Sequence, residues 1–283
     1  MRNETTYTFF MQKATAFMKE ATSSAKSICG RHLCSIYLFG GLAKGQFSKD
    51  MSDVDLLFIV TDDCPPEVVK ELEHKLINLE IEYEFLKRNS WDKLLYIFAL
   101  RTALFRSHFI LRQGSLRSMN LYALFKEGRG FDFSFGRLLF PFAPAKLVIR
   151  NILSGRKILF GNDLIQTCNL PSPTFLDFHR SFIVALAISI FGVVASIIFC
   201  TGTFFSIEAI KWYILNIYAV LEHKIPDIRS ATQYVVTKEP RFSSLVFRKF
   251  LELRENYSRD VIFSFISPLY LLYIHLTLSV KRA

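Results

Sequence analysis

Hydrophobic and polar residues in the first hundred positions alternate between the period of a helix and the period of a strand. Apolar side chains at helical spacing over residues 6–28 predict an amphipathic helix. Short runs rich in β-branched and aromatic residues predict buried strands at Leu33–Phe39 and Val54–Val60. A pair of prolines opens a helix that we expect over residues 66–78. Residues 81–85 alternate apolar and acidic side chains, which predicts a half-exposed strand.

Strand signals nearly stop after this region, and helical spacing takes over. One short extended piece is expected at residues 157–161, whereas apolar stripes at helical spacing cover residues 206–221 and 241–257. We therefore predict an α+β chain with two domains. A small mixed-sheet domain at residues 1–115 is followed by an α-helical bundle domain at residues 116–283.

Two stretches of the second half carry no charged residue, at residues 181–207 and 261–280, and each is long enough to span a bilayer about 30 Å thick. Thr201–Thr203 looks like a break between two shorter helices. The segment between the stretches holds nine Lys and Arg residues, which two spans would carry to the outside, against the positive-inside tendency. We favour buried bundle helices and leave membrane contact open.

Composition narrows the class of protein. With 51% hydrophobic residues, 29 Phe and only 21% charged residues among 283, the chain is too apolar to be disordered. A net charge of +10 favours a polyanionic partner, such as nucleotide phosphates, nucleic acid or an anionic membrane. Five cysteines without a CxxC pair argue against a disulfide scaffold, and the first residues lack the apolar run of a signal peptide. We expect a cytoplasmic protein.

Two groups of residues on neighbouring predicted strands carry candidate chemistry. Gly40 and Gly41 follow the first strand, where glycines and the N-terminus of a short helix let backbone N–H groups approach a phosphate. Asp53 and Asp55 stand two apart at the start of the next strand, so their carboxylates share one face. Such a pair is a natural Mg²⁺ site. Together, a phosphate-binding turn and a Mg²⁺ site would bind a nucleoside triphosphate.

The segment Tyr37–Phe58 resembles the signature of the polymerase-β-like nucleotidyltransferases. In that family an apolar strand leads to Gly-Gly or Gly-Ser, and about a dozen residues later Asp-x-Asp starts the next strand. The resemblance implies that Gly40 and Gly41 hold the triphosphate tail of a nucleotide, and that Asp53 and Asp55 coordinate two Mg²⁺ ions. Many members have Ser at the position of Gly41, so one hydroxyl contact to phosphate is missing here.

The resemblance also implies roles for a lysine and a third carboxylate. Lys44 falls where the family often has Arg or Lys, and is either a phosphate ligand or a surface residue. The family takes a third acidic residue from a later strand, and Glu80, Glu82 and Glu84 share one face of the strand predicted at residues 81–85. We assign the role to Glu82, as catalytic residue and metal ligand, with Glu84 as the next candidate. The alternative is an exposed acidic face.

A weaker resemblance continues into the second half. Gly155–Gly161 is similar to a Gly-x-x-Leu-(Tyr/Phe)-Gly stretch common in these transferases. Ile207–Ile225, followed by Pro226–Arg229, resembles the helical domain of the aminoglycoside adenylyltransferase-like members.

These observations lead to a hypothesis of function. The chain is expected to be a Mg²⁺-dependent nucleotidyltransferase that moves a nucleoside monophosphate from a triphosphate, ATP being the expected one, to an acceptor hydroxyl on a small molecule or a protein. The alternative is a non-catalytic nucleotide- or partner-binding module, such as a toxin-neutralising subunit, with membrane association as a further variant. We expect no stable nucleic-acid complex, and leave a homodimer open. The spacing of the six histidines argues against a zinc site, and no P-loop or GxSxG elbow is present.

Overall fold

The chain folds into two compact units. The structure is a computed structural model, and it describes residues 2–45, 54–85, 107–118, 144, 147, 150–151, 153–169, 172–199, 202–223 and 227–280. The first unit is built from residues 1–141 and 152–171, and the second from residues 142–151 and 172–283. This division differs from the predicted boundary between residues 115 and 116, because a late strand returns to the sheet of the first unit.

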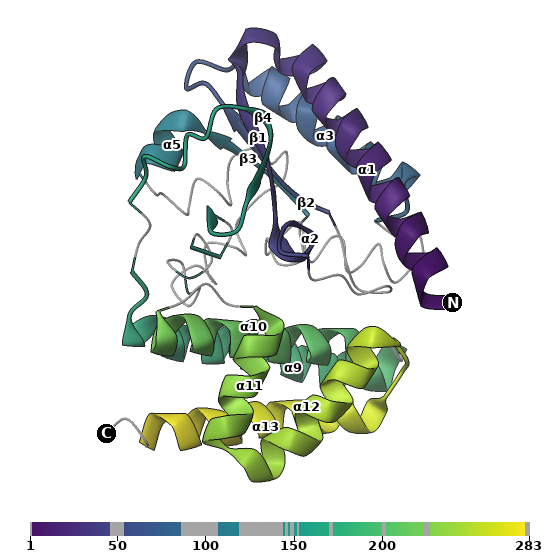
Figure 1. The fold of residues 1–283 in the computed structure, drawn as a ribbon, viewed down its shortest axis with the longest axis vertical. Coiled ribbons are helices and arrows are strands. Elements are labelled where there is room, and N and C mark those ends of the chain that lie inside the picture. Colours follow the sequence, from purple (N-terminus) through teal and green to yellow (C-terminus); the bar gives the residue numbers. More distant parts are fainter. Residues whose placement is uncertain are drawn as a thin grey trace. The chain divides into compact units, whose positions relative to one another are not determined.

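The first unit contains a mixed four-stranded sheet and the helices that cover it (Figure 1). In chain order its elements are α1 (Arg2–Cys29), the 3₁₀ turn η1 (Gly30–His32), β1 (Leu33–Phe39), α2 (Gly40–Ala43), β2 (Asp55–Val60), α3 (Pro66–Glu82), β3 (His108–Arg112), α5 (Gln113–Ser118) and β4 (Lys157–Gly161). The strand order is β3-β2-β1-β4; β1 is antiparallel to β2 and β4, and β2 is parallel to β3. The predicted small mixed sheet is confirmed.

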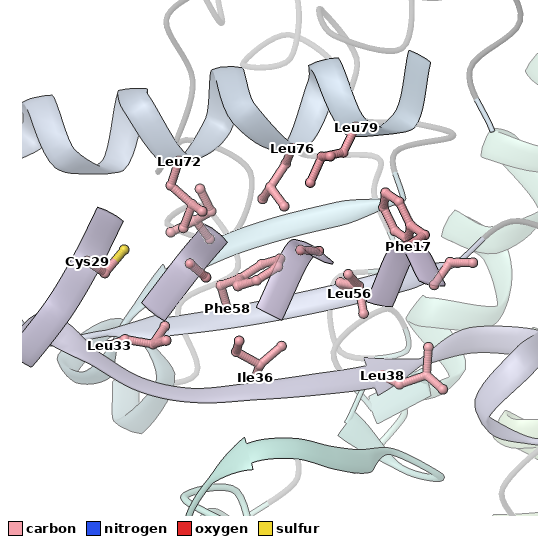
Figure 2. Packing of buried hydrophobic residues seen from close by; sticks show 14 of the residues in the cluster. Phe17, Cys29, Leu33, Ile36, Leu38, Leu56, Phe58, Leu72, Leu76 and Leu79 are labelled. Atoms are coloured by element: carbon pink, nitrogen blue, oxygen red, sulfur yellow. The ribbon is translucent and has the colours of Figure 1, made fainter. Parts of the chain in front are cut away.

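One face of this sheet packs against α1 and α3. Alternate residues of the central strands, among them Ile36 in β1 and Leu56 and Phe58 in β2, point to this face and meet the leucines of α3 and Phe17 of α1 (Figure 2). All are buried. Because strand residues alternate between faces, Asp55 belongs to the opposite set.

The strand predicted at residues 81–85 is wrong. Helix α3 continues to Glu82 and ends in a Schellman motif, in which the N–H of Phe85 donates to the carbonyl of Glu80 at 2.9 Å and that of Glu84 to Ile81 at 3.1 Å. Glu84 takes the left-handed conformation that such an ending needs, with φ 51°. The turn brings the rings of Tyr83 and Phe85 against α1, which accounts for the alternating apolar pattern without a strand.

Strand β3 was not predicted. It pairs with β2 in register, with Leu56 opposite His108 and Val60 opposite Arg112. Its sequence signal is a run of only three apolar residues at residues 109–111, bounded by Ser107 and by Gln113-Gly114. So short a run has no period that separates strand from helix.

The second unit is helical, as predicted. Its helices are α9 (Phe175–Phe199), α10 (Gly202–Glu222), α11 (Ile228–Lys238), α12 (Pro240–Glu255) and α13 (Val261–Val280). Helix α10 packs against α9, α13 and α11, and α9 ends just before the predicted break at Thr201–Thr203. Among the described residues, α9, α10 and α13 are long and apolar enough to cross a membrane by length and composition alone.

Candidate functional site

The site centres on the junction between β1, α2 and β2. Phe39, the last residue of β1, lies opposite Asp55, the first residue of β2. Gly40 follows with a positive φ of 71°, and a Cβ built on it would lie 1.7 Å from Oδ2 of Asp55. The carboxylate of Asp55 therefore lies directly against the backbone at the start of α2. Only glycine allows this approach.

Helix α2 begins with the two predicted glycines. It spans only Gly40–Ala43, and its first residues have no capping hydrogen bond from the side chain at the N-cap, Phe39. The N–H groups at the start of a helix are the ones without partners inside it. The structure thus brings the predicted phosphate turn, Gly40-Gly41, against one of the two predicted metal-binding carboxylates, Asp55.

Lys44 joins this group through a residue distant in sequence. Lys44 follows α2 directly, and its side chain lies across Gly155, where a Cβ would come within 3.0 Å of Cε of the lysine. Gly155 has a φ of 84°. The two segments that resemble the nucleotidyltransferases, at Tyr37–Phe58 and Gly155–Gly161, therefore meet at Lys44.

The Gly155–Gly161 segment is fastened to the sheet by a tyrosine. The hydroxyl of Tyr37 in β1 donates to the carbonyl of Asn162 at 3.1 Å and accepts from the N–H of Leu164 at 2.8 Å. Arg156 forms two hydrogen bonds with the carboxylate of Asp163, at 3.0 and 2.6 Å. Burial alone would raise the pKa of Asp163, but the bonds and charge of Arg156 hold it below its ordinary value. These contacts fix the chain that packs against Lys44.

Of the remaining predicted carboxylates, Glu82 and Glu84 do not lie on a strand next to Asp55. Asp53 lies outside the described residues. Glu82 is exposed in the last turn of α3, which packs on the Leu56 face of the sheet. Glu84 lies in the following turn and pairs with Lys13 at 3.7 Å. The third-carboxylate role of Glu82 stays a prediction, but the strand that motivated it does not exist.

Strand β3, which pairs with β2, has no carboxylate beside Asp55. In β3, register places Phe109 on the side of the sheet that carries Asp55, and the ring of Phe109 contacts that of Phe39 with centroids 6.0 Å apart. No residue of β3 is acidic. Among the described residues, no group of three or more His, Cys, Asp or Glu side chains could hold a metal ion.

A buried charged cluster, which the sequence did not reveal, lies on the other face. His108 in β3 contacts Glu80 through Nδ1 at 2.5 Å and Glu73 through Nε2 at 3.2 Å, and Ser107 donates to Glu80 at 2.5 Å. Burial acts to lower the pKa of His108, but the two carboxylates outweigh it and raise the pKa to about 9. Because α3 supplies both glutamates, the cluster fastens α3 to β3.

Two comparisons with known proteins found similarities to this chain. Residues 24–99 match the sequence model of the nucleotidyltransferase domain family. A solved structure with a similar fold is that of spectinomycin adenyltransferase AAD(9) from Enterococcus faecialis with ATP and spectinomycin. The TM-score is 0.56 and the identity 12%, over 93% of this chain and 98% of that one. No curated protein sequence matches the chain significantly.

The matched family range contains the whole junction of Gly40, Lys44 and Asp55. Residues 24–99 thus match a nucleotidyltransferase domain, which supports nucleotidyl transfer in general terms, and the chain has a fold similar to that of the solved adenyltransferase.

Proposed function

We propose that the protein is a Mg²⁺-dependent adenylyltransferase that moves AMP from ATP to a hydroxyl group of a small molecule. The observation that carries this proposal is the contact of the Asp55 carboxylate with Gly40 at the start of α2, beside Lys44. The contact puts a hard oxygen donor next to backbone N–H groups that can bind phosphate. The similar fold of a transferase that was solved with ATP and a hydroxylated acceptor supports the choice of substrates.

The donor set fits Mg²⁺, which prefers carboxylate oxygens. Asp53 and Asp55 would hold the ion, which when bound supplies charge stabilisation to the transferring phosphate. The backbone of Gly40 and Gly41 and the ammonium group of Lys44 would bind the β- and γ-phosphates. The oxygen of the acceptor hydroxyl forms a bond to the α-phosphorus and its proton passes to solvent, while the bond from that phosphorus to the bridging oxygen breaks and pyrophosphate leaves with the electron pair of that bond.

A second candidate is nucleotide binding without transfer. The observation that favours it is Phe109, an apolar residue on the Asp55 side of the neighbouring strand, where a carboxylate could have served as a base. Both candidates predict Mg²⁺-dependent binding of ATP. Only the first predicts release of pyrophosphate when an acceptor is added.

The test compares binding of ATP, GTP, CTP and UTP by calorimetry, with and without Mg²⁺. We expect ATP to bind only with Mg²⁺ in the wild type, and not to bind to the double variant Asp53→Asn, Asp55→Asn. The matched control, Glu67→Gln with Glu71→Gln, removes two exposed charges on α3 and should bind as the wild type does. Equal binding to the aspartate variant would refute the site.

Pyrophosphate release then separates the two candidates. Aminocyclitols and other hydroxylated amines serve as acceptors, and mass spectrometry should find a product heavier by one AMP. Binding without release for every acceptor class, proteins included, would favour the second candidate.

A further inference from the structure

The second unit turns two hydrophobic helix faces outward. Twenty large hydrophobic side chains are exposed among the described residues, and sixteen of them lie on α9 and α13. They recur at helical spacing and form one stripe on each helix. We call these two stripes the apolar face, marked by Ile183, Ile190 and Ile197 on α9 and by Ile262, Leu269 and Leu276 on α13.

The polarity of these helices is inverted relative to a water-soluble bundle. Every exposed residue from 181 to 198 and from 261 to 280 is apolar, while serine and histidine side chains face inward. Ser189 and Ser267 form a buried hydrogen bond at 2.5 Å, and the ring of His275 contacts the hydroxyl of Tyr213 at 2.7 Å. Helix α10 forms the core of the bundle instead. In its most apolar stretch 67% of the residues are buried, compared with 39% in α9 and 44% in α13.

The apolar face has almost no group with which a protein partner could form hydrogen bonds. The polar side-chain atoms described at this face are the hydroxyls of Tyr273 and Thr277, which already donate to Glu239 at 3.1 Å and to the carbonyl of Tyr273 at 2.9 Å. Interfaces between proteins carry a polar rim and about one hydrogen bond per 100–200 Å². Contact with lipid hydrocarbon chains needs neither a polar rim nor hydrogen bonds.

Helix α12 covers one side of α13, so lipid could contact only the other side. Tyr270 and Tyr273 of α13 donate to Ser243 and Glu239 at the start of α12, and Lys249 pairs with Asp260 just before α13. Helix α12 therefore runs beside α13, and its outer side carries exposed charges that include Arg241, Arg248 and Glu252. Charged side chains are costly inside a bilayer. Only one side of α13 can face lipid.

We propose that the apolar face is embedded in the interface of an anionic lipid bilayer, with α9 and α13 lying in the plane of the membrane. The charge of the unit suits this partner, because its residues hold fourteen Lys and Arg against eight Asp and Glu, a net charge of +6. Amphipathic helices bind such surfaces through buried apolar area and attraction to anionic headgroups. The proposal does not depend on nucleotidyl transfer.

The test is flotation of the full chain with vesicles of phosphatidylcholine alone or of an equal mixture with phosphatidylglycerol. The wild type should float, more strongly with the anionic lipid. The double variant Ile190→Lys, Leu269→Lys should lower the partition coefficient at least about tenfold, since two buried apolar side chains are lost. The control Phe242→Lys, Leu245→Lys changes two equally exposed residues on α12 and should float as the wild type does.

Two further readouts decide between lipid and other occupants. Leu269→Trp should be quenched by lipids brominated near the headgroup more than by lipids brominated at the chain end; the reverse order would indicate spanning and overturn the proposal. It is also overturned if the wild type does not float, or if the Lys variant on α9 and α13 floats equally well. A dimer that this variant converts to a monomer, without vesicle binding, would assign the face to a second copy instead.

Discussion

The carboxylate of Asp55 occupies the space that a side chain on Gly40 would need, since a Cβ there would lie 1.7 Å from Oδ2. Gly40 directly follows β1 and Asp55 begins β2, and the register that places Phe39 opposite Asp55 brings the two residues together. The predicted phosphate turn and one of the predicted metal-binding carboxylates are thus adjacent because residue 40 has no side chain.

Gly40→Ala should therefore disrupt the site. The new methyl group must displace Asp55 or the start of α2, so we expect Mg²⁺-dependent ATP binding to fall at least about tenfold, as for loss of one charged contact. Calorimetric titration measures it. Gly45→Ala is the control, because Gly45 has a similar φ of 70°, but no atom of the described residues lies within 4 Å of its Cβ position. It should cost about 1–2 kcal/mol of backbone strain and leave binding intact. Equal losses in both variants would mean that strain, not the Asp55 contact, governs the site.

Because of the buried His108 cluster, we expect the free energy of unfolding to decrease at alkaline pH. The folded-state pKa of His108 is raised from 6.5 to about 9, so the protonated histidine stabilises the fold fully below pH 6.5 and this contribution is lost as pH rises through about 9. His108→Gln lacks the contribution at every pH. The difference in free energy of unfolding between the wild type and this variant should shrink across that window in urea titrations. A constant difference would contradict the pKa assignment.

Tyr37→Phe tests how β4 and its following turn are held. The change removes the Tyr37 hydroxyl as an acceptor for the N–H of Leu164, which keeps its bond to the carbonyl of Asn162 at 2.9 Å, and it removes one donor to that carbonyl. The loss of these bonds should cost about 0.5–1.5 kcal/mol each. Hydrogen exchange at the Leu164 amide should accelerate more than exchange in the core of α3. Tyr218→Phe in the second unit is the control and should leave exchange at Leu164 as in the wild type.

Glu239 should make the second unit sensitive to acid. Its carboxylate caps α12 by accepting from the N–H groups of Phe242 and Ser243, and it also accepts from the hydroxyl of Tyr273. Burial acts to raise the pKa of Glu239, but these bonds lower it below 4.5. The stabilisation is therefore present above pH 4.5 and is lost as pH falls through the lower folded-state pKa.

Glu239→Gln removes the charge and should flatten this acid dependence in thermal unfolding followed by circular dichroism. Tyr273→Phe removes one donor only and should reduce it partly. If neither variant alters the acid limb, another carboxylate controls it.

Most of the fold followed from periodicity, but two elements near the site did not. Strand β1 was predicted with the bounds observed, and helix α13 coincides with the uncharged stretch at residues 261–280, for which we favoured a buried bundle helix. Apolar residues do alternate with acidic ones at residues 81–85, but the structure there is a Schellman turn. The turn buries alternate side chains by placing the rings of Tyr83 and Phe85 against Phe17. Alternation over five residues cannot separate these outcomes, since both put every second side chain on the core.

The site was predictable where its chemistry is local. Gly40, Gly41 and Asp55 lie together because adjacent antiparallel strands meet at a common end. The contact of Lys44 with Gly155 and the pairing of His108 with Glu73 and Glu80 join residues far apart in sequence. Nothing in the spacing of single residues encodes such contacts. They depend on the parallel crossover to β3 and on the late return of β4.

The pairing of β4 with β1 also limits where the chain can be truncated. Strand β1 is hydrogen-bonded to β4 from Ser35 to Leu38, so a protein ending at residue 115 would expose a row of unsatisfied backbone groups along an open sheet edge. Exposed edges of this kind recruit strands from other molecules. A chain cut after residue 115 therefore lacks part of the first unit, because the strand that covers the edge of β1 begins only at Lys157.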